Sequence, residues 1–147
     1  SVPRNNPLAT NAKADPAIWS YGHRNIQGLA FDPATKRGWA TEHGARGGDE
    51  LNLAEAGKNY GWPLVTRGCE YGSCDAIGRA RRAGMDDPLT VWPPRSIAPS
   101  GLAFNTGARY PGWEGQLFSG ALAGQALWRL PICRAAWGVS PGYMCWQ

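Results

Sequence analysis

The segment Gly44–Glu50 (GARGGDE) contains the residue types of a metal site built from oxygen ligands. Its glycines allow a sharp bend that exposes main-chain carbonyl groups, and Asp49 and Glu50 add two carboxylates. Calcium accepts both kinds of oxygen and therefore suits such a bend. The segment is not an EF-hand, because the alternating acids are absent, nor a phosphate loop, which needs Gly-Lys-Ser/Thr. Spacing alone favours a simpler alternative, a solvated acidic turn.

A second polar group, His23-Arg24-Asn25, directly precedes an apolar stretch. Arginine offers a planar fork for a carboxylate or a developing oxyanion, and asparagine adds a donor and an acceptor. The group could therefore hold an anionic ligand at the end of a sheet, although its three residue types alone favour a surface arginine beside a turn. His23 and His43 could each act as a base or a ligand, but a lone histidine is more often structural. The sequence contains no spacing typical of a hydrolytic triad or a glycosidase carboxylate pair.

Short β-strands are the elements expected to position these groups. The turn at 32–38 (DPATKRG) begins with Asp, has Pro to fix φ and ends with Gly, so it predicts a hairpin between its flanking strands. We expect residues 1–17 to form an extended arm, Ala56–Gly61 a turn, and residues 65–95 a long loop on one face. The predicted strands are Ile18–Tyr21, Ile26–Phe31, Trp39–Glu42, Glu50–Leu53 and Gln116–Leu122.

The composition indicates an all-β protein. With 20 Gly, 12 Pro and 8 Trp in 147 residues, many short strands and turns are favoured over long helices. The tetrapeptide Gly-Leu-Ala-Phe occurs at 28–31 and again at 101–104, each time before a turn and a strand. A repeated strand–turn–strand unit is typical of a propeller blade. A chance match between common residues is the alternative.

Charge and cysteine content narrow the function classes. A net charge of +4, with a small cluster at Arg79, Arg81 and Arg82, fits an anionic small molecule better than nucleic acid. No apolar run is long enough for a membrane span. The spacing of Cys69 and Cys74 permits a loop disulfide but does not match Cys-x-x-Cys, so an oxidising compartment is plausible. The chain begins at Ser1 without an initiator Met or signal peptide, which we interpret as a cut end.

Several segments together resemble a known family. YGHRNIQGLAF, ATEHGARGGDELNL, GKNYGWP and the later stretch Ala98–Leu130 are similar to the soluble quinoprotein glucose/sorbosone dehydrogenases, or aldose sugar dehydrogenases. The resemblance covers most of residues 18–130. It implies a six-bladed β-propeller of four-stranded antiparallel sheets, with pyrroloquinoline quinone (PQQ) and calcium near its axis. We therefore expect an all-β fold with about two to three blades over residues 1–130, followed by a divergent tail at 131–147.

The resemblance also implies site residues. Arg24 and Asn25 match a pair that contacts the quinone, and the arginine would stabilise charge as the quinone is reduced. The carbonyls of Gly44 and Ala45 match two ligands of the calcium bound to the cofactor; Ala45 stands where the family often has Pro. The remaining matches are to ligands of a second, structural calcium: the Glu50 carboxylate and the Tyr60 carbonyl.

Some functional groups of the family have no match in this chain. The catalytic His belongs to earlier blades, and neither His23 nor His43 matches it, while the arginines that clasp the cofactor's carboxylates belong to the last blade. A Lys that meets the cofactor in some members corresponds to Ala123.

We therefore expect an inactive fragment of a periplasmic or secreted enzyme that depends on PQQ and calcium. In this family such an enzyme oxidises an aldose sugar at C1 to a lactone and passes the electrons to an external acceptor. The alternative is a non-enzymatic, propeller-derived module that binds calcium or a partner.

Overall fold

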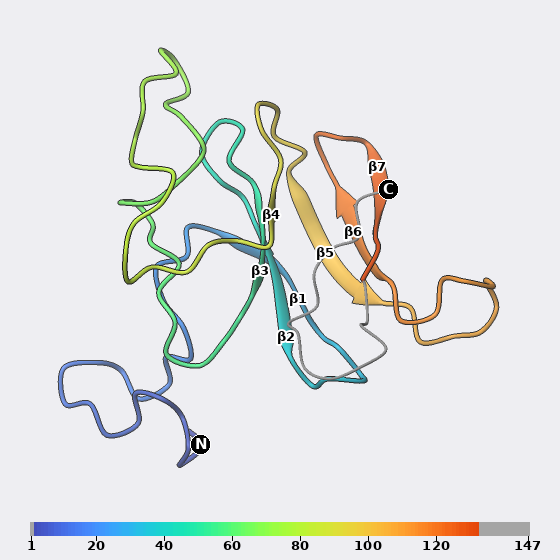
Figure 1. Ribbon diagram of the computed structural model, residues 1–147, viewed down its shortest axis with the longest axis horizontal. Coiled ribbons are helices and arrows are strands. Elements are labelled where there is room, and N and C mark those ends of the chain that lie inside the picture. Colours follow the sequence, from blue (N-terminus) through green and yellow to red (C-terminus); the bar gives the residue numbers. More distant parts are fainter. Residues whose placement is uncertain (1, 133–147) are drawn as a thin grey trace.

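The computed structural model describes residues 2–132, which form only β-strands, bridges and turns (Figure 1). The strands pair in two antiparallel sheets, one in the order β1-β2-β3-β4 and the other in the order β5-β6-β7. No helix in this part of the chain could cross a membrane. The strands are β1 (Ile26–Phe31), β2 (Gly38–Glu42), β3 (Glu50–Leu53), β4 (Thr90–Val91), β5 (Pro99–Phe104), β6 (Leu117–Ala121) and β7 (Ala126–Leu130). The all-β prediction is confirmed.

The predicted hairpin is present as β1 and β2, which pair from Phe31 opposite Gly38 towards Ile26. Its turn is held by Asp32, whose amide donates to the Arg37 carbonyl at 2.9 Å and whose carboxylate accepts the Ala34 amide at 2.9 Å. The left-handed conformation in this turn belongs to Lys36, with φ of 59°, and not to Gly38. The hairpin prediction is confirmed, although the glycine has a different role from the one expected.

Two local predictions are wrong. Ile18–Tyr21 is not a strand, because its backbone bonds to the turn at 57–60, with the Gly57 amide on the Trp19 carbonyl (2.8 Å) and the Tyr21 amide on the Lys58 carbonyl (3.0 Å). The segment 65–95 is not a loop throughout, since β4 pairs with β3 and completes the first sheet. Strand β4 has two residues, too few to show an alternating pattern.

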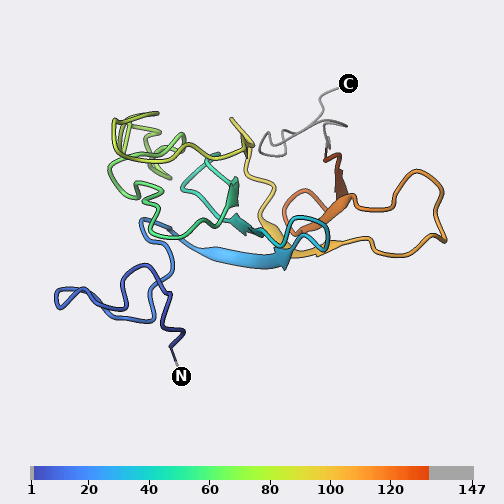
Figure 2. The same ribbon diagram turned by 60° about the horizontal axis from the view of Figure 1, so that its bottom comes forward.

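The two sheets lie side by side and share one core (Figures 1 and 2). Gly28 of β1 makes the close approach possible, because a side chain there would place its Cβ 2.5 Å from the Ser100 carbonyl oxygen. The Thr41 hydroxyl donates to the same carbonyl at 3.0 Å. The two Gly-Leu-Ala-Phe segments fall in β1 and β5, the first strand of each sheet, so the repeat is structural. The buried core consists of Trp39, Leu51, Leu53, Trp92, Ile97, Leu117, Ala121, Leu130 and Ile132.

The long segment between β3 and β4 folds back over the Gly44–Gly48 bend. Arg46 and Cys69 exchange two backbone hydrogen bonds, of 3.2 and 3.1 Å, and a disulfide joins Cys69 to Cys74. The loop after β5 projects away from the sheets, on the side opposite the N-terminal arm (Figures 1 and 2). The divergent tail predicted at 131–147 lies outside the described residues from 133 onward, while Ile132 belongs to the core.

Candidate functional site

A small pocket lies where Gly22 and Arg24, shortly before β1, meet the bend after β2, the start of β3 and the segment 60–66. Four of the six predicted site residues line it: Arg24, Gly44, Glu50 and Tyr60. The pocket has a volume of about 10 Å³, which is close to the minimum that holds one water molecule. Asn25 and Ala45 do not line the pocket. The Asn25 side chain is exposed and accepts a hydrogen bond from Gln27 at 2.7 Å.

Arg24 is held in place on three sides. Its backbone amide donates to Glu42 Oε2 at 2.7 Å, and its guanidinium donates to the His43 carbonyl at 3.1 Å. The guanidinium carbon also lies 5.2 Å from the centre of a Trp62 ring, a cation–π contact. These contacts occupy one guanidinium N–H group, and the described residues give the others no hydrogen-bond partner, so the others are available to an anionic ligand.

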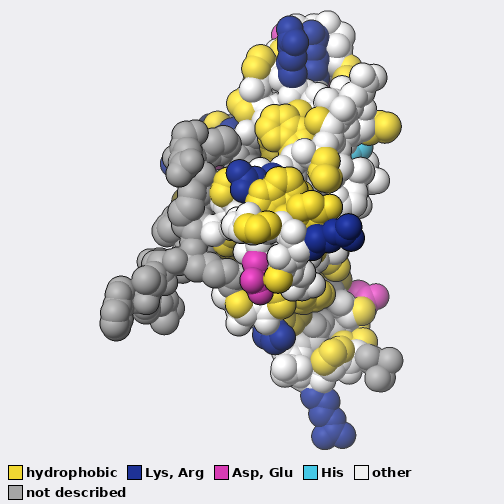
Figure 3. All heavy atoms as spheres, turned by 90° about the vertical axis from the view of Figure 1, so that its right-hand side faces the viewer, with side chains coloured by type: hydrophobic (Ala, Val, Ile, Leu, Met, Phe, Trp, Pro, Cys, Tyr) yellow, Lys and Arg dark blue, Asp and Glu magenta, His cyan; other side chains and the backbone are white. Residues whose placement is uncertain are grey.

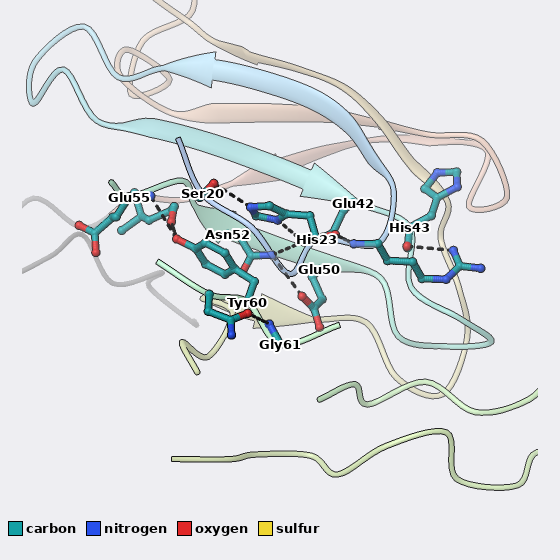
Figure 4. Close-up of polar contacts among 12 residues, drawn as sticks. Ser20, His23, Glu42, His43, Glu50, Asn52, Glu55, Tyr60 and Gly61 are labelled. Atoms are coloured by element: carbon teal, nitrogen blue, oxygen red, sulfur yellow. Dashed lines mark hydrogen bonds and ion pairs between the residues drawn. The ribbon is translucent and has the colours of Figure 1, made fainter. Parts of the chain in front are cut away.

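The buried carboxylate of Glu42 organises the polar side chains around Arg24. Figure 4 shows His23 between Ser20 and Glu42, at 2.9 Å and 3.0 Å. Nδ1 of His23 therefore donates to the carboxylate, and Nε2 of a neutral ring accepts from the hydroxyl of Ser20. The same ring stacks on Tyr60 with 4.5 Å between ring centres. His23 thus has a structural role, and His43 is likewise fixed, with Nε2 2.9 Å from the Pro99 carbonyl.

The carboxyl group of Glu50 also belongs to this network, but few contacts offset the cost of burying its charge. Asn52 donates to both acids, at 2.7 Å to Glu42 and 3.1 Å to Glu50 (Figure 4). Desolvation by burial raises the pKa of Glu50 to about 7; the Asn52 hydrogen bond opposes the rise and the Glu42 charge adds to it. Among the described residues Glu50 forms no ion pair, and Oδ1 of Asn52 is buried without a hydrogen-bond partner. A cation bound here would offset both costs.

The Gly44–Gly48 bend is too tight for side chains at its ends. A Cβ on Gly44 would lie 1.9 Å from the Gly48 carbonyl oxygen, and the Gly48 amide donates to the Ala45 carbonyl at 3.0 Å. The predicted pairing of Asp49 with Glu50 as ligands is not what the structure contains. Asp49 is fully buried, and its carboxylate already accepts hydrogen bonds from Gly44, Ser96, Ile97 and Ala98.

The oxygen atoms around the pocket fit a hard cation such as Ca²⁺. The described residues contain no cluster of three or more His, Cys, Asp or Glu side chains that could hold a metal, so main-chain carbonyls must supply ligands. The carbonyls of Gly44 and Tyr60 accept no hydrogen bond within the part of the chain that the structure describes. These two carbonyls and the Glu50 carboxylate are oxygen donors of the kinds that calcium prefers.

Sequence reasoning missed Glu42, Asp49 and Asn52 as organisers of this pocket. All three lie within or beside the Gly44–Glu50 segment, but their roles depend on partners up to 49 residues away. The one available signal was polar residues at the ends of predicted strands, where a buried side chain must find a hydrogen-bond partner.

Comparison with known proteins identifies a family that this chain resembles over most of its length. The family model described as Glucose / Sorbosone dehydrogenase matches residues 1–139. The aldose sugar dehydrogenase YliI of Escherichia coli is 45% identical over 124 residues, which cover 82% of this chain and 33% of that protein. The chain thus spans about a third of the length of the curated relatives it matches first.

Solved structures agree with this assignment. A crystal structure of a glucose dehydrogenase is 45% identical and superposes with a TM-score of 0.83, covering 98% of this chain and 41% of that one. The PQQ-bound aldose sugar dehydrogenase of Streptomyces coelicolor is 31% identical with a TM-score of 0.61, covering 95% and 36%. Together with the two antiparallel sheets, these matches confirm the predicted fold, part of a β-propeller. The chain belongs to the Glucose / Sorbosone dehydrogenase family.

Proposed function

We propose that this chain supplies part of the cofactor site of a sugar dehydrogenase that depends on PQQ and calcium. The reaction is oxidation of an aldose at C1 to a lactone, with the electrons passed to an external acceptor. One observation carries the proposal: in a chain of this family, residues from four separate segments, Arg24, Gly44, Glu50 and Tyr60, meet in one pocket. The PQQ-bound relative supports the choice of cofactor.

Each predicted residue has a role in this proposal. Arg24 and Asn25 contact the quinone, and the carbonyls of Gly44 and Ala45 hold the calcium that accompanies it. The Glu50 carboxylate and the Tyr60 carbonyl hold a second, structural calcium. When bound, PQQ supplies the acceptor for the hydride of the sugar.

Arg24 suits the first role because its guanidinium is always charged and is fixed before any ligand arrives. The His43 carbonyl and the Trp62 ring hold it, and it stabilises negative charge that develops on a bound anion. The catalytic base and the arginines that clasp the cofactor's carboxylates come from parts of the propeller outside this chain. The Cys69–Cys74 disulfide supports a periplasmic or secreted location, where such bonds persist.

A hybrid protein tests the proposal. The matching third of the E. coli aldose sugar dehydrogenase is replaced by residues of this chain, and sugar oxidation is measured with added PQQ and Ca²⁺. We expect activity that depends on both additions, is lost with Arg24→Ala and persists with Arg109→Ala, an exposed arginine outside the pocket. A hybrid that folds, as judged by circular dichroism, yet neither binds PQQ nor oxidises sugar overturns the proposal.

A further inference from the structure

The carboxylate of Asp49 joins the bend of the first sheet to the segment that leads into the second. Its Oδ1 accepts the Gly44 amide at 3.1 Å. Its Oδ2 accepts the amides of Ile97 at 2.8 Å and Ala98 at 2.9 Å, together with the Ser96 hydroxyl. The side chain is fully buried, so these four donors replace all of its hydration.

Only a carboxylate fits these surroundings, because every neighbour of the two oxygens is a donor. An asparagine has the same shape but carries one oxygen and one NH₂ group. Whichever way it is turned, its NH₂ group would face either the Gly44 amide or the amides of Ile97 and Ala98. One side of the connection would then be lost, and a buried donor would remain unpaired.

The bond to Gly44 reaches the candidate site through a single peptide group. The N–H of Gly44 and the C=O of His43 belong to the same planar, trans unit and point in opposite directions. Asp49 accepts the N–H, and the guanidinium of Arg24 donates to the C=O at 3.1 Å. Because the peptide group is rigid, a hydrogen bond that fixes the Gly44 N–H also fixes the direction of the His43 carbonyl, which accepts from Arg24.

We propose that Asp49 is a positioning residue of the cofactor site: it acts on the Arg24 guanidinium through the His43–Gly44 peptide group, and on the Gly44 carbonyl by anchoring the N–H at which the bend begins. The inference rests on the proposed function for its ligands, PQQ and Ca²⁺. Asp49 itself touches neither ligand. It sets the direction of two groups that do, while also tying the bend to the neighbouring sheet.

The test compares Asp49→Asn with Thr41→Val in the full chain. Thr41 is also fully buried and also joins the two sheets, through its hydrogen bond to the Ser100 carbonyl, but the Gly44 amide donates to Asp49 and not to Thr41. Ca²⁺ is titrated in the presence of PQQ, and the half-saturating Ca²⁺ concentration is read from the PQQ absorbance. Hydrogen exchange of the Gly44 amide and the thermal midpoint are measured on the same samples.

We expect both variants to lower the thermal midpoint, since both lose an inter-sheet hydrogen bond. Asp49→Asn should also raise the half-saturating Ca²⁺ concentration about 10- to 100-fold, the usual effect of losing an outer-shell partner, and speed exchange of the Gly44 amide. Thr41→Val should change neither. If Asp49→Asn does not fold, Ser96→Ala removes one donor from the same carboxylate and should shift both readouts in the same direction, by less.

The possible outcomes distinguish a failure of the positioning role of Asp49 from a failure of the proposed function. Equal Ca²⁺ requirements in Asp49→Asn and Thr41→Val overturn the positioning role but leave the cofactor site intact. If the folded wild-type chain does not bind PQQ without the rest of a propeller, the hybrid protein described above decides the proposed function. In that case unchanged Gly44 exchange in Asp49→Asn would show separately that Asp49 does not hold the bend.

Discussion

At the residue scale, Glu42 is the acid on which the geometry of the pocket depends most. Its carboxylate accepts from the His23 ring, the Arg24 amide and the Asn52 amide group, and the residue is 3% exposed. Altering a buried acceptor that has three donors destabilises the fold, because each donor left unpaired has lost its hydration without gaining a hydrogen bond. Glu42 therefore contributes both to the stability of this end of the sheet and to the position of Arg24, two residues before β1.

We predict that Glu42→Gln lowers the free energy of unfolding by about 1–3 kcal/mol, because an amide NH₂ must then face one of these donors. The matched control is Glu55→Gln. Glu55 pairs with Arg37, but its side chain is 43% exposed, so the loss there should stay below about 1 kcal/mol. Urea unfolding of both variants measures the difference. Equal losses would mean that the buried network contributes no more than a surface ion pair.

Glu50 should make stability depend on pH in a definite direction. Burial raises its pKa from 4.5 to about 7 in the folded chain, so between these values the folded state holds a proton that the unfolded state has released. Stability contributed by this group is therefore greatest at low pH, falls as pH rises through this window, and is constant above it. The total loss is at most about 3 kcal/mol, since the side chain is only partly buried.

The measurement is urea unfolding in a metal chelator from about pH 5 to about pH 8. Glu50→Gln should remove the decline and be more stable than the wild type at the upper end. Added Ca²⁺ should restore wild-type stability there, because it binds the ionised carboxylate, and should do nothing for the variant. Parallel pH curves for the two proteins would contradict the raised pKa.

At the element scale, the two copies of Gly-Leu-Ala-Phe provide an internal comparison. Gly28 in β1 and Gly101 in β5 have the same sequence context, but their surroundings differ. A Cβ at position 28 would lie 2.5 Å from the Ser100 carbonyl oxygen and 2.5 Å from the Thr41 hydroxyl, whereas one at 101 would meet nothing within 4 Å. The first glycine is thus required by inter-sheet packing and the second is not.

Gly28→Ala should therefore lower the free energy of unfolding by about 1–3 kcal/mol, because β1 must move away from β5. Gly101→Ala should be neutral or slightly stabilising, as expected where alanine only restricts the unfolded chain. Thermal and urea unfolding of the pair test this. Similar losses in both would show that the two sheets adjust to an added methyl group, and that the close approach at Gly28 is not needed.

The same elements show how far sequence could lead. The hairpin of β1 and β2 was predictable because its turn residues and strand residues agree locally. Ile18–Tyr21 has strand-forming residues, but local composition cannot reveal that its hydrogen-bonding groups are used by the turn at 57–60. Arg24, Gly44, Glu50 and Tyr60 were identified through family resemblance. Asp49 could not be assigned its role, since its partners at 96–98 are brought near only by the packing of the sheets.

At the scale of the whole molecule, apolar side chains remain on the outside of both sheets. Figure 3 shows hydrophobic side chains gathered on the side where β6 and β7 lie, and Leu127 of β7 is 69% exposed. On β1 of the first sheet Leu29 and Phe31 are 57% and 66% exposed, and the nearby Trp19 is 47% exposed. They border a cavity of about 550 Å³. A sheet face of this kind is normally covered by another layer.

We therefore predict that the purified chain self-associates through the outer face of β1, because a contiguous apolar patch on an edge strand favours pairing with any complementary surface. Sedimentation velocity over a range of concentrations should reveal species larger than 15.8 kDa. Leu29→Lys should return the chain to a monomer with an unchanged far-ultraviolet spectrum, since the side chain points away from the core. Tyr71→Lys, at a side chain that is 65% exposed but lies on the loop between β3 and β4, is the control and should leave association unchanged. A wild-type chain that stays monomeric at every concentration, or association that persists in Leu29→Lys, would show that the outer face of β1 does not drive association.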